Sequence, residues 1–424
     1  MELVVKPIQR LDGTVTVPPS KSYTHRAIIL ASLAKDTSEI SNPLLSYDTL
    51  ASVDACRKIG AEIEVREDSL RIKGVFGEPK NPNQAIDVKN SGTTLRIMTP
   101  VCGLCNGLVT LTGDESIQKR PMQPLLDALE QLGVKTTSNE GKAPVTVQGP
   151  MKGGVCSIRG DVSSQFISGL LIAAPLAEAE TTIKITTPLK SKPYLDLTID
   201  LMEKFGAKYE KEDHAYRVSG RQIYNSIDYT VEADYSSAAL VLAAAAVTDS
   251  EVTVSNLNID SKQGDRKIID ILRVMGVHVK TMKDSVLVSG TGQLEGLEVD
   301  LGDHPDLVPP VAALGAVAHG KTIIKNVAHL RFKESDRLKA MATELGKMGA
   351  KIKAGEDYLE IHGVKDLKGA YLFGYDDHRI VMSLAVAALC AKGETRIETA
   401  ESIPVSFPGY VEAMNSLGAD MKLK

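Results

Sequence analysis

The sequence contains no tryptophan, and only 4% of its residues are aromatic. Proteins that bind single-stranded nucleic acid stack bases on aromatic side chains, so an aromatic platform of that kind, or one for sugars, is not expected. The formal net charge is -5, whereas proteins that bind polyanions usually carry a basic excess. Any anion site in this chain must therefore be a local concentration of Lys and Arg.

Long apolar runs are also missing. No stretch of about 18 apolar residues occurs, so no membrane-spanning helix is expected, and residues 1–7 lack the charged-then-apolar layout of a signal peptide. The chain has only five cysteines, and their odd number and scatter favour a reducing cytoplasm. Cys102 and Cys105 form a C-x-x-C pair, but no second Cys or His pair completes a zinc site, so we interpret them as core thiols.

Sequence motifs for common cofactors are absent as well. The glycines at 290, 292 and 296 miss the dinucleotide-binding spacing, and there is no P-loop. A nucleophile elbow and an H-E-x-x-H helix are also absent. These absences exclude the main nucleotide-dependent, serine-hydrolase and zinc-peptidase patterns.

A sixfold repeat is present in this chain of 424 residues. An amphipathic helix ends at a Gly and is followed by two short alternating strands. The six Gly residues are 73, 73, 70, 73 and 69 residues apart, at Gly60, Gly133, Gly206, Gly276, Gly349 and Gly418. Each suits the left-handed position that ends a helix.

A second helix type alternates with the first. Each of its six members is apolar nearly all round, as in residues 238–247, which predicts burial. Their polar openings are SKS at 20–22, NSGT at 90–93, SSQ at 163–165, DYSS at 234–237, DHPD at 303–306 and DDHR at 376–379. The predicted unit is strand, buried helix, strand, amphipathic helix and two strands (βαβαββ).

Six such units exceed one ordinary core, so we predict two α/β domains of three units each. The leading strand at residues 1–5 is expected to complete the last domain. The predicted domains are then 1–18 with 232–424, and 19–231. A single long solenoid is the alternative, but the terminal units are no more polar than the middle ones, as solenoid caps would be.

Basic residues lie at or beside the predicted helix starts, where the helix dipole disfavours cations and favours anions. They are Lys21, Arg26, Arg120, Lys333, Arg337 and Arg379. Any one alone could be a solvated surface charge, but six together indicate an anion between them. Ser22 and the Ser163-Ser164-Gln165 opening could add hydroxyl, amide and backbone N–H donors. For Ser91, Asp234, Ser236 and Ser237, plain helix capping explains the residues at least as well.

Acidic residues accompany these bases. Asp306 could cap its helix or act as a general base, and Glu334 could pair with Arg337 three residues later. His378 could relay a proton. Carboxylates among cations are expected to stay ionised near neutrality. These patterns alone leave open a two-domain binder or a transferase of small anions.

Seven motifs, in order, resemble those of the 5-enolpyruvylshikimate-3-phosphate synthase family. They are PPSKSYTHR at 18–26, NSGTTLR at 90–96, KRP at 119–121, SSQF at 163–166, SKPY at 191–194, KESDRL at 333–338 and DHR at 377–379. The resemblance implies the enolpyruvyl transferase fold, with two inside-out α/β domains that have buried helices and outer sheets and an active site in the cleft between them. It implies transfer of the enolpyruvyl group of phosphoenolpyruvate to the 5-hydroxyl of shikimate 3-phosphate, with release of phosphate, in the shikimate pathway to chorismate. The implied route is addition and then elimination, with no metal or organic cofactor.

The resemblance also implies roles for residues of this chain. The implied shikimate 3-phosphate ligands are Lys21, Ser22, Arg26, Ser163, Ser164, Gln165, Ser191, Tyr194, Asp306 and Lys333. The implied phosphoenolpyruvate ligands are Lys21, Gly92, Arg120, Gln165, Arg337 and Arg379. The implied catalytic residues are Asp306 as general base, Glu334 and His378 as proton-handling neighbours, and Lys21, which touches both substrates. At Gly92, a Cβ atom would intrude on a ligand pressed against the backbone.

Some positions depart from the family pattern, chiefly Val405, where many bacterial members have Lys; Ile97 and His329 also differ. A rival is the UDP-N-acetylglucosamine enolpyruvyl transferase family, which usually has a Cys before its Arg-Pro pair, whereas residues 114–121 contain none. A second rival is a non-catalytic anion-binding scaffold, which would not need the acid–base residues at 306, 334 and 378. We further expect a monomer with no nucleic-acid or membrane partner.

Overall fold

The computed structural model describes all residues from Met1 to Lys424. The chain divides into two compact units: the first unit comprises Met1–Pro18 and Glu232–Lys424, and the second unit comprises Pro19–Val231. Six four-stranded sheets are present, three in each unit. None of the helices is both long and apolar enough to cross a membrane.

The second unit contains three βαβαββ repeats. The first is β14(Asp228–Thr230), α1(Lys21–Leu33), β3(Thr37–Ser41), α2(Tyr47–Lys58), β4(Glu62–Val65) and β5(Ser69–Lys73). The second is β6(Ile86–Asp87), α3(Gly92–Cys102), β7(Leu108–Thr112), α4(Gln123–Gln131), β8(Lys135–Asn139) and β9(Lys142–Gln148), with the 3-10 helix η1(Ile117–Lys119). The third is β10(Gly154–Ile158), α5(Ser164–Ala173), β11(Thr181–Ile185), α6(Lys192–Lys204), β12(Glu210–Glu212) and β13(Ala215–Val218), with η2(Ala174–Leu176).

The first unit repeats the same order three times. Its first repeat is β2(Asp12–Thr16), α7(Tyr235–Ala246), β15(Asp249–Ser255), η3(Gly264–Lys267), α8(Ile268–Val274), β16(His278–Met282) and β17(Ser285–Thr291). The next is β18(Glu298–Asp300), η4(Pro305–Leu307), α9(Val308–Val317), β19(Lys321–Lys325), η5(Ala328–Phe332), α10(Arg337–Lys347), β20(Lys351–Ala354) and β21(Leu359–His362). The last is β22(Tyr371–Leu372), α11(His378–Ala388), β23(Thr395–Glu398), η6(Ala400–Val405), α12(Tyr410–Ser416), β24(Asp420–Leu423) and the N-terminal β1(Glu2–Lys6).

Each sheet has the same topology. In the third repeat of the second unit, for example, the order is β10-β11-β13-β12. The first pair is parallel because α5 carries the chain back across the sheet, and the remaining pairs are antiparallel. The predicted βαβαββ unit is therefore confirmed.

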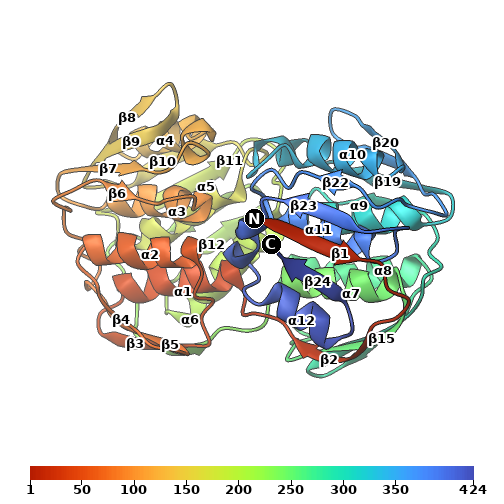
Figure 1. The fold of residues 1–424 in the computed structure, drawn as a ribbon. Helices are drawn as coiled ribbons and strands as arrows, with labels where there is room; N and C mark the ends of the chain where they lie inside the picture. The colour runs from red at the N-terminus through yellow and green to blue at the C-terminus, as the bar shows by residue number, and fades with distance from the viewer. The chain divides into compact units, whose positions relative to one another are not determined.

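Three sheets join segments that are far apart in the sequence. β1 pairs antiparallel with both β23 and β24, and so takes the place of the last strand of its repeat. Figure 1 shows the red β1 between these two blue strands. β2 pairs parallel with β15, and β14 pairs parallel with β3. β1 thus pairs within the domain that the leading strand was expected to complete, but the sequence interpretation missed β2 as a separate strand.

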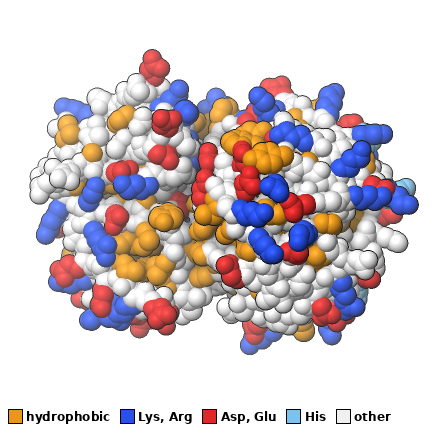
Figure 2. All heavy atoms as spheres, viewed as in Figure 1, with side chains coloured by type: hydrophobic (Ala, Val, Ile, Leu, Met, Phe, Trp, Pro, Cys, Tyr) orange, Lys and Arg blue, Asp and Glu red, His pale blue; other side chains and the backbone are white.

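Buried helices fill the interior of each unit. Every residue of α7 is buried, and so is every residue of α9 from Val308 to Ala316. The outward faces of the strands are exposed and charged, as in the Lys6–Asp420 pair at 3.2 Å, and Figure 2 shows Lys and Arg interspersed with Asp and Glu. The sheets thus lie outside and the apolar helices inside, as predicted.

The repeated glycines have the predicted conformation. All six that follow the amphipathic helices have positive φ, between 83° and 107°. The five cysteines are free thiols. Cys102 ends α3, but Cys105 lies in the following turn and not in the helix; both are buried, as expected of core thiols.

Candidate active site

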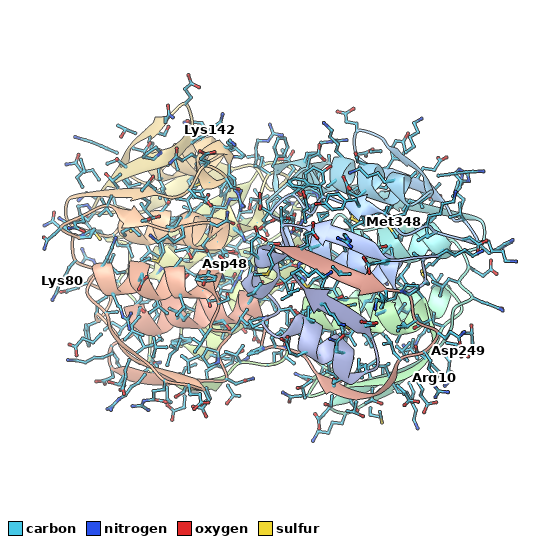
Figure 3. The ribbon with its side chains drawn as sticks, in the orientation of Figure 1. Arg10, Asp48, Lys80, Lys142, Asp249 and Met348 are labelled. Carbon is cyan, nitrogen blue, oxygen red and sulfur yellow. The ribbon has the colours of Figure 1, made fainter.

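In the second unit, the first turn of α1 places an ammonium group against a buried carboxylate. Ser20 caps this helix, Lys21 is its first residue, and Lys21 Nζ lies 3.0 Å from Asp48 Oδ2. Asp48, labelled in Figure 3, comes from the first turn of α2, where the helix dipole also favours a negative charge. Although burial raises it, the pKa of Asp48 is held well below its usual range by Lys21 and His25. Asp48 therefore fixes Lys21 as a charged, half-buried cation.

His25 completes this cluster one turn into α1. Its side chain is fully buried, its Nδ1 lies 2.8 Å from Ser52 Oγ, and its Nε2 lies 3.6 Å from Asp48. Burial lowers the pKa of His25, although Asp48 acts in the opposite direction. Of these two neighbours, Lys21 lowers the pKa of Asp48 more through its charge than His25 does.

The start of α3 brings Gly92 against Arg120. Ser91 caps this helix by accepting from the backbone N–H of Thr94 at 3.2 Å, so capping accounts for Ser91. A Cβ atom on Gly92 would collide with Arg120 Nη1. The sequence interpretation attributed this glycine to space for a ligand; in the structure, the nearest reason is the guanidinium of Arg120, itself 5% exposed.

Gln165 is fixed by two neighbours on α3. Arg96 Nη1 donates to Gln165 Oε1 at 2.9 Å, and Gln165 Nε2 donates to Thr93 Oγ1 at the same distance. Arg96 also lies over the ring of Phe166, 5.5 Å from its centroid. These bonds set the orientation of the amide at the start of α5, so Arg96 and Thr93 are positioning residues that the sequence interpretation did not single out.

Arg26 is fully buried, with 1% of its surface exposed. It donates from Nε to Thr198 Oγ1 at 2.7 Å and from Nη1 to the Ser22 carbonyl at 2.9 Å. It also donates to the Tyr194 carbonyl at 3.0 Å. Burial lowers the pKa of Arg26 to about 10. The structure therefore shows Arg26 joining α1 to α6 and fixing the backbone beside Ser22 and Tyr194.

The remaining predicted site serines of this unit lie at helix starts. Ser163 caps α5 by accepting from the Gln165 backbone N–H at 3.3 Å, and Ser164 is the buried first residue. Ser191 precedes α6 with φ of 56° and makes no side-chain cap bond. Its left-handed backbone and 5% exposure mark it as a constrained position.

In the first unit, Arg337 is the centre of a charged cluster. It opens α10, is 1% exposed, and contacts three carboxylates. Its Nε donates to Asp377 Oδ2 at 2.9 Å, its Nη2 to Glu334 Oε2 at 2.9 Å, and its Nη1 to Asp306 Oδ1 at 2.7 Å. Burial alone would lower the pKa of Arg337, but these carboxylates raise it above its ordinary value. The predicted Glu334–Arg337 pair is confirmed.

Asp306 lies between two guanidinium groups. Its second oxygen accepts from Arg379 Nη2 at 3.2 Å. It sits in η4, ahead of α9, and the N-cap position of α9 is the next residue, Leu307. Arg337 and Arg379 together orient the Asp306 carboxylate.

His378 and Arg379 begin α11, and Asp377 caps it. Asp377 is fully buried, accepts from the Arg379 backbone N–H at 3.0 Å and from Ser335 Oγ at 3.0 Å, and binds Arg337. His378 is 1% exposed. Lys333 and Glu334 lie partly exposed between η5 and α10. Asp377 lies in one of the motifs, but the sequence interpretation assigned it no role; its position just before His378 and Arg379 was the available signal.

Two further buried carboxylates, Asp234 and Asp265, lie near the start of α7. Asp234 caps that helix by accepting from the Ser237 backbone N–H at 2.9 Å, and Ser236 Oγ donates to Asp265 Oδ2 at 2.5 Å. Burial and the nearby Asp306 raise the pKa of Asp265 to about 7. Capping thus accounts for Asp234, and Asp265 is a further acid that the sequence interpretation missed.

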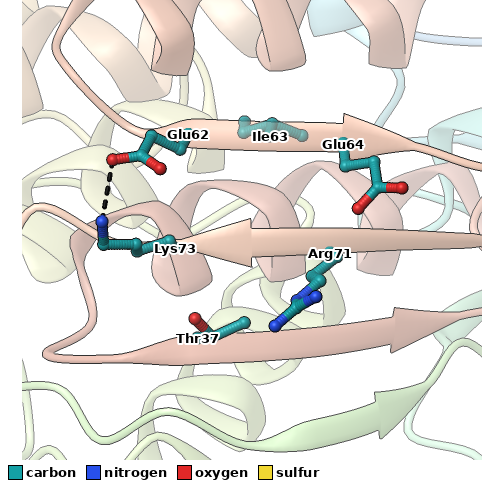
Figure 4. Close-up of a pocket in the computed structure, with 6 residues that line it drawn as sticks. All are labelled: Thr37, Glu62, Ile63, Glu64, Arg71 and Lys73. Carbon is teal, nitrogen blue, oxygen red and sulfur yellow. Dashed lines mark hydrogen bonds and ion pairs between the residues drawn. The ribbon is translucent and has the colours of Figure 1, made fainter.

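One surface cavity lies away from these residues. It has a volume of about 360 Å³ and lies on the sheet formed by β3, β4 and β5. Figure 4 shows its side chains, with the Glu62–Lys73 ion pair at 2.9 Å across neighbouring strands. None of the predicted site residues lines it. No group of three or more His, Cys, Asp and Glu side chains is arranged to hold a metal ion.

Comparisons with known proteins point to one family. The family model described as EPSP synthase (3-phosphoshikimate 1-carboxyvinyltransferase) matches residues 5–414. A protein of Methanocaldococcus jannaschii named 3-phosphoshikimate 1-carboxyvinyltransferase is 51% identical over all of this chain and 99% of its own length. A protein of the same name from Methanocella arvoryzae is 49% identical over 97% of each chain. The solved EPSP synthase of Acinetobacter baumannii superposes with a TM-score of 0.83 at 28% identity, covering both chains completely. The chain therefore belongs to the EPSP synthase (3-phosphoshikimate 1-carboxyvinyltransferase) family.

Proposed function

We propose that this protein transfers the enolpyruvyl group of phosphoenolpyruvate to the 5-hydroxyl of shikimate 3-phosphate, in the shikimate pathway to chorismate and the aromatic amino acids. The observation that carries the proposal is the position of Asp306. The resemblance matches this carboxylate to the family's general base, and two buried guanidinium groups, from Arg337 and Arg379, hold it at 2.7 and 3.2 Å. A carboxylate oriented in this way can accept a proton while the cations bind an anionic substrate.

The second unit supplies groups suited to shikimate 3-phosphate. Ser22, Ser163 and Ser164 present hydroxyls and backbone N–H groups at two helix starts, which favour phosphate. Gln165, Ser191 and Tyr194 complete this set, with Arg26 fixing the backbone at Ser22 and Tyr194. Lys333, from the first unit, is the further cation assigned to this substrate.

Phosphoenolpyruvate needs cations for one phosphate and one carboxylate. We assign these to Arg120 beside Gly92 in the second unit, and to Arg337 and Arg379 in the first. Guanidinium groups bind such anions through paired N–H donors. Lys21 is assigned to both substrates, and Gln165 adds an amide donor.

The proposed chemistry proceeds in two balanced steps. In the first, Asp306 takes the proton of the 5-hydroxyl, the oxygen bonds to C2 of phosphoenolpyruvate, and the methylene carbon gains a proton to become a methyl group. In the second, the methyl group loses a proton, the double bond reforms, and the C–O bond to phosphate breaks. Lys21, Glu334 and His378 are the residues assigned to move these protons and to balance the charge that develops.

This proposal requires residues of both units to act on one pair of substrates. The monomeric state and the cytoplasmic location inferred from the sequence stay predictions.

Phosphate release tests the proposed function directly. Mixing the protein with phosphoenolpyruvate and shikimate 3-phosphate should release phosphate, and omitting either substrate should abolish the release. Release with UDP-N-acetylglucosamine, but not with shikimate 3-phosphate, would assign the protein to the rival enolpyruvyl transfer. No release with either acceptor would favour a non-catalytic anion-binding protein.

A further inference from the structure

The segment 373–376 leads directly into Asp377, His378 and Arg379, and its backbone is constrained. Tyr375 and Asp376 have φ of 59° and 53°, so two consecutive side-chain-bearing residues adopt the left-handed conformation. Such residues are uncommon there and persist only where surrounding contacts impose the conformation. Gly374 allows the chain to approach α11 and β23, because a Cβ atom would collide with Val381.

Glu344 supplies contacts that hold this segment. It lies on α10 and is fully buried. Its Oε2 accepts from the Phe373 backbone N–H at 3.0 Å, and its Oε1 accepts from the Tyr375 hydroxyl at 2.8 Å. Lys347 Nζ approaches the same two oxygens at 2.7 and 3.0 Å from the end of the helix. Each oxygen of this carboxylate therefore binds both the segment and the lysine.

The same helix holds the far end of the segment. Arg337, the first residue of α10, binds Asp377 at 2.9 Å, and Glu344 lies about two turns further along. The backbone N–H of Asp376 also donates to Thr399 Oγ1 at 3.1 Å. Segment 373–377 is thus fixed to α10 at two points, with its left-handed turn between them.

We propose that Glu344 and Tyr375 are positioning residues that hold the 373–377 segment so that Asp377 orients Arg337 and the start of α11 presents Arg379. Neither residue touches the proposed substrate groups; both act through Asp377. The proposal rests on the proposed function, because it assigns Arg337 and Arg379 to phosphoenolpyruvate. Burial, together with the Glu344 carboxylate, raises the pKa of Tyr375 to about 12, so its hydroxyl remains a donor at neutral pH.

The test separates positioning from general stability. Tyr375→Phe removes only the hydroxyl that binds Glu344. We expect KM for phosphoenolpyruvate to rise roughly three- to tenfold, since small displacements of positioning groups weaken productive binding. KM for shikimate 3-phosphate, whose proposed ligands lie mostly in the second unit, should change less than twofold. Glu344→Gln should change the same two constants in the same direction, and more strongly.

Tyr371→Phe is the matched control. The Tyr371 hydroxyl also contacts carboxylates, at 2.8 Å to Glu2 and 2.5 Å to Glu398. Tyr371, however, lies on an exposed sheet edge, outside segment 373–377. Tyr371→Phe should leave the KM values for phosphoenolpyruvate and for shikimate 3-phosphate unchanged. The melting temperature of every variant is measured alongside.

Each result decides the proposal. A selective rise in KM for phosphoenolpyruvate with Tyr375→Phe supports it. Unchanged KM values, or equal changes for both substrates that follow the loss of melting temperature, would overturn it. If Glu344→Gln fails to fold, the single-hydroxyl variant decides alone. Absence of activity in the unaltered protein would instead contradict the proposed function.

Discussion

Lys21 owes its position to a residue that is distant in the sequence. Asp48 binds it at 3.0 Å, and both side chains are less than 15% exposed. Such a pair is costly to break from one side, because the remaining charge loses its partner while it stays partly buried. The motif around Lys21 could be identified from the sequence, but Asp48 could not, since nothing in the local pattern distinguishes it from an ordinary first-turn acid.

Asp48→Asn tests this pairing. We expect the free energy of unfolding to fall by about 1–3 kcal/mol and kcat/KM to fall roughly tenfold or more, as Lys21 loses its fixed position. Denaturant unfolding and steady-state rates measure the two effects. Asp54→Asn is the control on the same helix: its pair with Arg57 is 3.5 Å long and well exposed, so a change within about 0.5 kcal/mol is expected. Equal effects of the two substitutions would contradict the role of Asp48.

Gly92→Ala tests the close approach of Arg120. The added methyl group must displace the guanidinium, so KM for phosphoenolpyruvate should rise roughly tenfold or more while the protein still folds. Gly346→Ala in α10 is the control, because its Cβ would meet no atom within 4 Å and Ala favours a helix by about 0.5–1 kcal/mol over Gly. Wild-type KM values for Gly92→Ala would show that Arg120 does not need this space.

At the scale of elements, most of the architecture could be predicted from the sequence. Helices with fully apolar and amphipathic patterns alternate, and the Gly residues after the amphipathic helices recur at nearly constant spacing. β2 and β14 were harder to predict, because both strands are short and polar. β2 pairs with β15 and β14 pairs with β3, and each partner lies about two hundred residues away in the sequence. Pairing across that separation depends on the fold, not on local sequence.

The buried acid beside α7 gives a pH prediction at this scale. The pKa of Asp265 is raised to about 7 from an ordinary value of 3.8, so the folded state binds more protons than the unfolded state between these pH values. Its contribution to stability is therefore present at low pH and lost as pH rises towards 7 and above. Asp265→Asn removes this dependence.

We therefore compare the melting temperature of Asp265→Asn with that of the unaltered protein at each pH. The difference, variant minus unaltered protein, should be more positive at pH 8 than at pH 5. The control is Asp270→Asn on α8, whose side chain is 58% exposed and should show no such pH-dependent difference. A difference that is constant across pH, or of opposite sign, would contradict the raised pKa of Asp265.

At the scale of the whole molecule, a symmetric set of repeats carries different residues at equivalent helix starts. α1, α3 and α5 open with Lys21, Gly92 and Ser164, whereas α7 opens with capping groups and a buried acid. The resemblance identified the site residues, most of which lie in motifs. The roles of the residues that orient them emerged only from the structure, because they depend on contacts between elements: Arg96 and Asp377 also lie in motifs, and Glu344 lies in none.

Residues of both units are proposed to act in one enolpyruvyl transfer, and phosphate release from variants of each unit tests this requirement. The assay compares the unaltered protein with Lys21→Met in the second unit and Asp306→Ala in the first, with phosphoenolpyruvate and shikimate 3-phosphate present. We expect each substitution to lower turnover by about 100-fold or more, the range typical of lost acid–base groups. Unaltered turnover in either variant would contradict a reaction that needs both units.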